Sequence, residues 1–259
     1  MNANMFRTMR PNNGRLWAKV NNDKFEIRSL TQDKLEEALN ILDASFFLNE
    51  SVCNGCEINL PENRQSRLEL RELCRITAED GVSLVVVEAT SGKIVSVAFN
   101  KIQFLPDNNE EPFFIKFRNE STHSIQAQAL MDFMIEVDGK VDVFSMFKID
   151  SLCELMFLAT LPDYERNGFG NMVTKYTIEL TRELSQGIGL DDINPDLRTK
   201  RPKAVTAIFT SLFSQKIGKL NDFQILSTNP YTEFIFNGKT FDQRINPMHK
   251  NSHHVVLLI

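Results

Sequence analysis

Two glycines between an apolar run and a helical pattern form a turn that could bind a phosphate group. Residues 155–159 form an apolar run typical of a strand, Pro162 ends it, and Gly168 and Gly170 precede a helical pattern. Such a turn exposes backbone N–H groups beside the positive end of a helix dipole, and glycine allows an approach that a Cβ would block. An ordinary glycine-containing connection is the alternative, because the spacing matches neither a Rossmann fingerprint nor a Walker loop.

Cysteine and histidine are the other residue types that could carry chemistry. Cys53 and Cys56 form a CxxC pair, but structural zinc needs four ligands, and the sequence has no second pair or close HxxxH. A thioredoxin-like role would place the pair at a helix start in a βαβ unit, whereas Cys53 follows a predicted helix. We expect no metal, and we interpret Cys74 and Cys153 as core thiols. Surface or core roles are expected for the histidines near the C-terminus, His249, His253 and His254.

The hydrophobic pattern predicts the elements that position these groups. Apolar residues at helical spacing predict helices at about 35–46, 62–80, 127–137, 168–184 and 211–220. Runs of β-branched and aromatic residues predict strands at about 25–30, 82–89, 93–104, 155–159, 204–209, 223–236 and 255–259. This order predicts an α/β fold (an α+β mixed sheet), with a central mixed twisted sheet of about seven strands and helices on both faces. Residues 1–22 lack a hydrophobic period and are interpreted as a flexible N-terminal arm, and residues 23–259 as a single domain.

Composition excludes several classes of protein. Hydrophobic residues make up 42% and charged residues 24% of the 259 residues, which suits a globular core and excludes a disordered chain. The net charge of −5 argues against nucleic-acid binding, because neutralising phosphates requires a basic face. No run of about 18 apolar residues predicts a membrane span, and the N-terminus has no secretory signal. We therefore expect a cytoplasmic protein with reduced cysteines.

Three segments resemble, in the same order, parts of the GNAT N-acetyltransferases. Residues 161–170, LPDYERNGFG, resemble the acetyl-CoA-binding turn of that superfamily. Residues 203–218, KAVTAIFTSLFSQKIG, are similar to the next strand and helix of its insect arylalkylamine N-acetyltransferase branch. Residues 46–50, FFLNE, are similar to that branch's acidic segment after the first helix. The matches extend over residues 24–259 and imply a GNAT-like fold.

The resemblance implies catalytic roles for individual residues. Glu50 matches the general-base glutamate that takes a proton from the amine, directly or through water, and the flanking Phe46 and Phe47 would line the substrate site. From the residues alone, Glu50 would be an ordinary surface carboxylate past a helix end. Ser214 matches the serine near the CoA sulfur, where a hydroxyl can protonate the departing thiolate. Thr210 would lie one helical turn earlier, and we favour a hydrogen bond to a helix carbonyl for its hydroxyl.

The resemblance also implies where the cosubstrate acetyl-CoA binds. The end of the strand at residues 155–160 would bind the pantetheine arm like an added strand and supply an N–H for the oxyanion. The cofactor-binding residues are then Leu158, Ala159, Thr160, Arg166, Asn167, Gly168, Phe169, Gly170 and Asn171. Two departures stand out: Glu165 occupies the place of the family's Arg or Gln, and residues 219–223, KLNDF, are one longer than its KLGF.

We therefore expect an acetyl-CoA-dependent N-acetyltransferase that acetylates a small primary amine by direct attack in a ternary complex. The amine would be an arylalkylamine, a polyamine or agmatine, and no metal is involved. We expect a monomer that binds neither nucleic acid nor a membrane. The alternative, motivated by the two departures, is a diverged non-catalytic GNAT-fold protein that binds a CoA thioester or a protein partner. A third interpretation, a redox or zinc protein built on the CxxC pair, predicts a bound metal or a low-pKa thiol.

Overall fold

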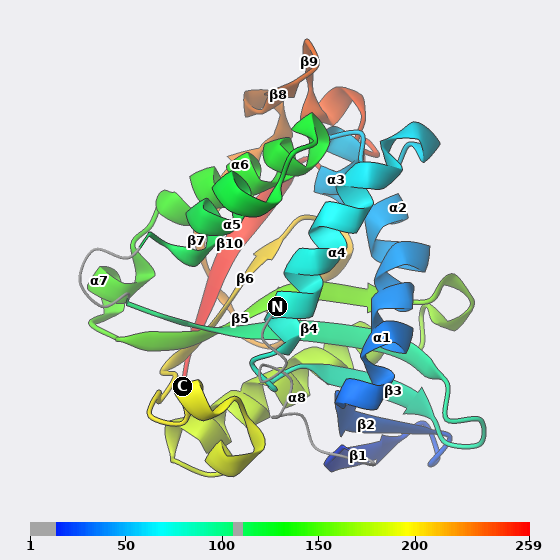
Figure 1. The fold of residues 1–259 in the computed structure, drawn as a ribbon, viewed down its shortest axis with the longest axis vertical. Helices are drawn as coiled ribbons and strands as arrows, with labels where there is room; N and C mark the ends of the chain where they lie inside the picture. Colours follow the sequence, from blue (N-terminus) through cyan, green and yellow to red (C-terminus); the bar gives the residue numbers. More distant parts are fainter. Residues whose placement is uncertain (1–13, 106–110) are drawn as a thin grey trace.

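A computed structural model describes residues 14–105 and 111–259, and eight strands of this part form one sheet (Figure 1). Neighbouring strands are antiparallel except for β5 and β6, which are parallel. The mixed sheet confirms the predicted class, with eight strands where about seven were expected. In sheet order, the strands are β1 Leu16–Val20, β2 Phe25–Ser29, β3 Leu84–Glu88, β4 Ile94–Phe104, β5 Ser151–Thr160, β6 Ala204–Phe209, β10 Asn251–Leu258 and β7 Gln224–Pro230.

The first strand corrects the prediction of a flexible arm over residues 1–22. Strand β1 forms an antiparallel hairpin with β2, and Trp17 and Val20 pack on the core. Asn21, Asn22 and Asp23 all have positive φ, between 52° and 61°, so these polar residues form the hairpin turn. Residues 1–13 of the predicted arm lie outside the described residues.

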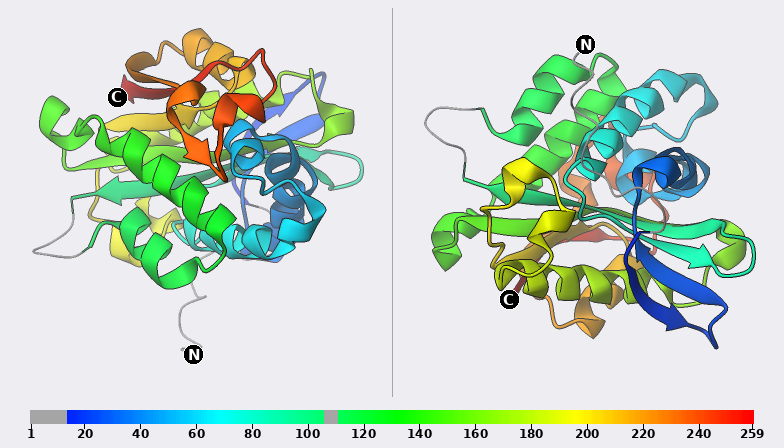
Figure 2. Two further views of the ribbon diagram at one scale, coloured as in Figure 1. Left: turned by 90° about the horizontal axis from the view of Figure 1, so that it is seen from above. Right: turned by 60° about the horizontal axis from the view of Figure 1, so that its bottom comes forward.

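Helices cover both faces of the sheet. Helices α1, α4, α5 and α6 lie on one face and α8 on the other, as the right-hand view of Figure 2 shows. Helices α3, α5 and α7 are additions to the predicted set. The α-helices are α1 Leu35–Ile41, α2 Phe47–Asn49, α3 Ser51–Gly55, α4 Arg64–Ala78, α5 Phe113–Ser121, α6 Ile125–Gly139, α7 Val143–Phe147, α8 Phe169–Ser185 and α9 Leu212–Leu220.

The predicted strand at residues 223–236 is divided in the structure. Strand β7 ends at Pro230, a single turn of 3-10 helix follows at Tyr231–Glu233, and β8 (Ile235–Phe236) pairs with β9 (Lys239–Thr240) in a separate hairpin. The side chain of Tyr231 is fully buried in the core on the α1–α6 face. The break in the strand therefore places a tyrosine hydroxyl beside the segments described next.

Candidate active site

Strands β5 and β6 separate partway along the sheet. They pair only at Cys153 with Val205 and at Glu154 with Thr206, although β5 continues to Thr160. Strand β5 stays paired with β4 on its other side, where an extra residue, Met156, forms a β-bulge. Past this point, the edge of β5 that faces β6 is open.

The backbone groups at this open edge belong to alternate residues. Leu161 N–H donates to Val95 C=O of β4 at 2.9 Å, so backbone groups of Leu161 face β4. Because neighbouring residues in a strand point their N–H and C=O groups to opposite sides, those of Thr160 and Leu158 face the opening. Ala159 faces β4 instead, and its C=O accepts a hydrogen bond from the Ser96 hydroxyl at 2.8 Å. Leu158, Ala159 and Thr160 were all predicted to bind acetyl-CoA. Of these, only Leu158 and Thr160 direct their backbone N–H and C=O groups into the opening.

The glycine turn leads directly into α8. Arg166 and Gly168 adopt positive φ values of 62° and 79°, and Gly168 is the N-cap residue. Within residues 14–105 and 111–259, no group accepts a hydrogen bond from the backbone N–H of Arg166, Asn167 or Gly168. The first N–H groups of a helix also lack partners within the helix. The turn and the start of α8 thus present a series of N–H donors, as an anion requires.

Side chains fix this turn against its neighbours. The Asn167 amide donates to Tyr164 C=O at 3.0 Å, and the Phe169 ring is buried against Phe25, with ring centroids 4.7 Å apart. A Cβ on Gly170 would lie 3.1 Å from the Ile217 side chain, so α8 and α9 approach closely here. Phe169 was predicted to bind the cofactor, but its side chain is buried in the core. It can therefore contact a ligand only through its backbone.

The longer 219–223 segment closes α9 without disturbing the turn. Asp222 has a positive φ of 60°, which accommodates the additional residue after the helix. The Asn221 amide donates to the Asn171 side chain at 2.8 Å and to Ile217 C=O at 2.9 Å. The segment therefore joins the C-terminal end of α9 to the start of α8.

Glu50 is the N-cap of α3 and lies between two short helices. Its carboxylate accepts hydrogen bonds from the N–H groups of Val52 at 2.9 Å and Cys53 at 2.7 Å. Its own N–H donates to Phe46 C=O at 2.9 Å. The carboxylate is half-buried, and these hydrogen bonds fix its orientation.

The two predicted aromatic residues occupy different environments. Phe47 is fully buried in the core, so its ring cannot line an open site. Phe46 is half-buried, and its ring stands edge-on to that of Phe157 on β5 at 5.3 Å between centroids. Phe46 therefore connects the segment before Glu50 to the strand at the opening.

Tyr231 lies near Glu50 and Thr210, a position that the sequence did not indicate. Its hydroxyl donates to Thr210 C=O at 2.5 Å. Burial, and next the charge of Glu50, raise the pKa of Tyr231 above its usual value, so the phenol stays protonated. A single tyrosine in the polar segment STNPYTE, residues 227–233, carries no sequence signal of this placement.

Ser214 lies in the first turn of α9 and forms a capping box with Ser211. The hydroxyl of Ser211 accepts from Ser214 N–H at 3.1 Å, and the hydroxyl of Ser214 accepts from Ser211 N–H at 3.1 Å. Thr210 precedes the N-cap residue, so the prediction that it lies one helical turn before Ser214 is wrong. The reason is that β6 ends at Phe209 and the helix begins only at Leu212.

His249 lies beside the same helix end. Its Nδ1 accepts from Leu212 N–H at 3.1 Å, and its ring stands edge-on to Phe213 at 5.6 Å between centroids. Burial lowers the pKa of His249, and the nearby charge of Glu50 opposes that shift. A histidine expected to have a surface or core role thus lies within electrostatic reach of Glu50.

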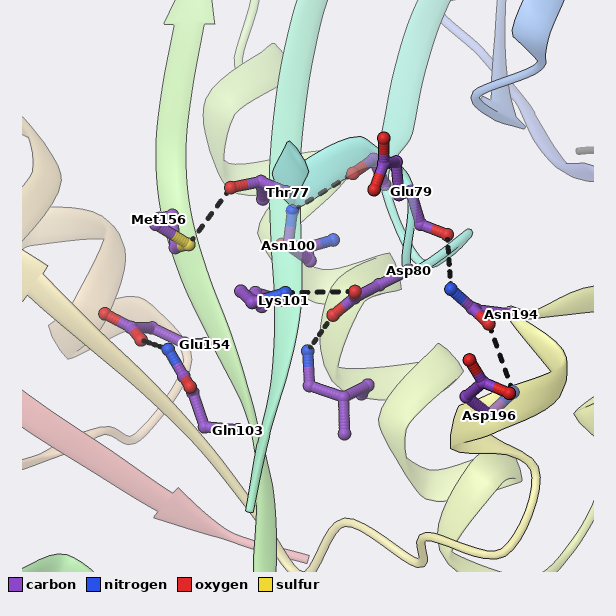
Figure 3. Close-up of polar contacts among 12 residues, drawn as sticks. Thr77, Glu79, Asp80, Asn100, Lys101, Gln103, Glu154, Met156, Asn194 and Asp196 are labelled. Atoms are coloured by element: carbon purple, nitrogen blue, oxygen red, sulfur yellow. Dashed lines mark hydrogen bonds and ion pairs between the residues drawn. The ribbon is translucent and has the colours of Figure 1, made fainter. Parts of the chain in front are cut away.

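A buried carboxyl lies where β5 and β6 begin to separate. Glu154 is 5% exposed and accepts from the Gln103 amide at 2.9 Å (Figure 3). Burial, and then the charge of Asp138, raise the pKa of Glu154 to about 8. On the same face, the Asp80 carboxylate accepts from Lys101 at 3.0 Å (Figure 3). The uncharged form of Glu154 is therefore the one the fold favours.

The CxxC pair lies directly after Glu50. Both Cys53 and Cys56 are fully buried free thiols, and burial raises their pKa well above the usual value. A reactive thiolate is therefore disfavoured at both positions. Among the residues that the structure describes, no three His, Cys, Asp or Glu side chains are grouped as a metal site would need. Over the same part of the chain, no helix is long and apolar enough to cross a membrane.

Solved structures of amine acetyltransferases superpose on nearly the whole chain. Arylalkylamine N-acetyltransferase 2 from Aedes aegypti does so with a TM-score of 0.73 at 18% identity, over 91% of this chain and 99% of its own. An agmatine N-acetyltransferase gives a TM-score of 0.72 at 16% identity, over 92% of this chain and 100% of its own. A Drosophila melanogaster polyamine N-acetyltransferase, which forms N-acetylagmatine, gives a TM-score of 0.70 at 16% identity, over 91% of this chain and 100% of its own.

These similarities concern the fold. The sequence matches no protein-family model, and no curated protein matches it in sequence. At identities of 16–18%, shared architecture is what the superpositions establish. The mixed sheet with helices on both faces is thus a known architecture: this chain has the fold of the GNAT N-acetyltransferases.

Proposed function

We propose that the protein is an acetyl-CoA-dependent N-acetyltransferase that acetylates a small primary amine by direct attack in a ternary complex. The observation that carries this proposal is the separation of β5 from β6. A glycine turn with unpaired N–H donors follows β5, and the segment that leads to Glu50 contacts β5 through Ser45 and Phe46. The fold neighbours include enzymes named for arylalkylamines, agmatine and polyamines, and these three classes are the candidate acceptors.

The chain has groups suited to acetyl-CoA. The N–H donors of residues 166–168 and of the first turn of α8 suit the pyrophosphate, since both backbone donors and helix dipole favour an anion. The open edge of β5 at Leu158 and Thr160 suits the amide groups of pantetheine, which can pair with it as an added strand. An N–H on this edge can donate to the oxyanion that forms as the thioester is attacked.

Glu50 is proposed as the general base. An amine arrives mostly as ammonium and must lose a proton before its nitrogen can attack the thioester carbon. The Glu50 carboxylate takes that proton, the new C–N bond forms, and the C–S bond breaks to release the CoA thiolate. Ser214 is proposed to protonate the thiolate, because its O–H group can turn from Ser211 C=O, 3.1 Å away, toward a ligand. The attacking nitrogen loses its second proton as the amide forms, and that proton replaces the one given up by Ser214.

Replacement of Glu50 by glutamine tests this proposal. Glu50→Gln keeps an amide oxygen that can accept at the α3 N-terminus but removes the basic carboxylate. We expect kcat/KM to fall by about 10²–10⁴, as loss of a general base costs, with acetyl-CoA affinity close to that of the wild type. Glu62→Gln, at an exposed position, is the control and should leave both unchanged. A Glu50→Gln variant with the wild-type rate would exclude Glu50 as the base.

The non-catalytic alternative makes a different prediction for the same protein. One of the two departures that favoured this alternative, the longer segment at 219–223, has a simple structural explanation. Asp222 accommodates the additional residue, and the Asn221 side chain joins α9 to α8. Glu165 remains as an exposed carboxylate on the turn. A protein of this kind would bind acetyl-CoA and release no thiol with any amine. We further propose that the enzyme is a cytoplasmic monomer with no bound metal.

A further inference from the structure

The helix that leads to Glu50 contains a π-turn. Helix α1 passes at Leu42–Phe46 into a π-helical turn, which closes with Phe47 N–H donating to Leu42 C=O. A π-turn contains one residue more than an α-turn, at a cost in hydrogen-bond geometry, and such turns occur frequently at functional sites. No proline or glycine lies within this turn, so neither residue type accounts for it.

The π-turn changes which side chains face the core. Helical spacing from Leu39 and Leu42 predicts Phe46 on the buried face, but Phe46 is only half-buried and Phe47, five residues after Leu42, is fully buried instead. Ser45, three residues after Leu42, also faces the core. Ser45 is only 8% exposed, and a hydroxyl in an apolar cluster requires a partner. That partner is the carbonyl oxygen of Thr160, to which Ser45 Oγ donates at 2.9 Å.

Thr160 occupies a special position at the end of β5. Its backbone groups face the opening between β5 and β6, where no strand pairs with them. The Thr160 C=O accepts the hydrogen bond from the Ser45 hydroxyl. The Thr160 N–H points in the same direction, toward the opening. The Thr160 hydroxyl is within 2.8 Å of the Ser96 hydroxyl on β4, so both its side chain and its carbonyl are held.

The same turn holds Glu50. Phe46 C=O accepts the Glu50 N–H at 2.9 Å, and Ser45 C=O accepts the Asn49 amide at 3.0 Å. Over residues 14–105 and 111–259, the Ser45 hydroxyl makes the side-chain hydrogen bond that joins the segment carrying the proposed base to the strand carrying the proposed thioester site, beside the packing of Phe46 on Phe157.

We propose that Ser45 is a positioning residue that fixes the Glu50 segment relative to the end of β5. This inference rests on the proposed function, because the distance that matters is the one between the base and the attacked carbonyl. Its hydroxyl is bonded to a backbone carbonyl of the protein itself, so its loss should leave substrate binding largely intact. A small displacement of reacting groups lowers the rate of the chemical step steeply, by up to about 10² for 1 Å.

The test compares two buried serines that each donate to a backbone carbonyl. Ser66, fully buried in α4, donates to Asn63 C=O at 2.6 Å and is distant in sequence from every site residue. For Ser45→Ala we expect kcat to fall about 10–100-fold, with KM for acetyl-CoA within about threefold of wild type. For Ser66→Ala we expect kcat to stay within about twofold of the wild-type value, although both substitutions lower the thermal stability by a similar amount.

The outcomes separate this inference from the proposed function. A wild-type protein that acetylates an amine, with equal kcat for Ser45→Ala and Ser66→Ala, would overturn the role of Ser45 alone. A wild-type protein that acetylates no amine would overturn the proposed function and this inference with it. If Ser45→Ala does not fold, Ser45→Thr and Ser45→Val form an isosteric pair that differs in the hydroxyl. A kcat at least about tenfold higher for the threonine variant supports the inference, and equal values contradict it.

Discussion

At the scale of single residues, Glu50 combines a structural and a proposed chemical role. Serine, threonine, aspartate and asparagine are the usual N-cap residues, and a glutamate reaches the N–H groups of Val52 and Cys53 with a longer side chain. Those two hydrogen bonds fix the carboxylate without using all of its lone pairs, since each oxygen can accept more than one. A base held in this way is already oriented before the amine arrives.

Glu154 gives a prediction about pH and stability. In the unfolded chain its carboxyl titrates near about 4.3, and in the folded chain its pKa is about 8. Between these values the folded chain holds a proton that the unfolded chain has lost, so stability falls as pH rises. Glu154→Gln removes this dependence and should be more stable than wild type at pH 9, by up to about 5 kcal/mol at about 1.36 kcal/mol for each pH unit between the two pKa values, with little difference near pH 4.

Denaturant unfolding at a series of pH values measures this effect. Glu120→Gln, at an exposed position, is the matched control and should show the wild-type pH dependence. If the stabilities of Glu154→Gln and wild type differ by the same amount at pH 4 and pH 9, then Glu154 does not titrate as its burial implies.

At the scale of elements, the glycine turn and α8 form the proposed anion site, and Glu165 lies on it. Its side chain is exposed, so its repulsion of a pyrophosphate acts through solvent and is screened by salt. We expect Glu165→Gln to bind acetyl-CoA about two- to fivefold more tightly at low ionic strength, and equally at about 0.5 M salt. Calorimetric titration of both proteins at two salt concentrations measures the difference.

The salt dependence serves as the control within that experiment. A gain in affinity that persisted at high salt would indicate a structural effect of the substitution. Weaker binding by the glutamine variant would mean that Glu165 contacts the ligand favourably, contrary to the placement proposed for the pyrophosphate.

Elements with a strong local pattern were predictable from the sequence. Strand β6 has the predicted bounds, Ala204–Phe209, because a β-branched and aromatic run is bounded by polar residues on both sides. Helix α8 follows Gly168 as predicted, since the apolar residues after it recur at helical spacing. The π-turn at Leu42–Phe46 was not predictable, because its additional residue is stabilised by contacts with β5 that are distant in sequence.

At the scale of the whole molecule, the proposed site brings together segments from across the chain. Glu50, Thr160, Ser214 and Tyr231 come from four separate segments, on α3, β5, α9 and the turn after β7. The resemblance in sequence indicated the first three, because each lies in a short motif. Tyr231 has no motif, and only the position of β7 at the edge of the sheet, next to β10, places its hydroxyl against Thr210.

The most direct test of the central claim is the release of free CoA thiol when the purified protein meets acetyl-CoA and an amine. The panel comprises an arylalkylamine, agmatine and a polyamine, each with an amine-free control, and mass spectrometry identifies the acetylated product. The proposal predicts saturable thiol release that depends on at least one amine, yields its N-acetyl derivative and falls about 10²–10⁴-fold in Glu50→Gln. Thiol release that no amine increases, from a protein that binds acetyl-CoA, would contradict it.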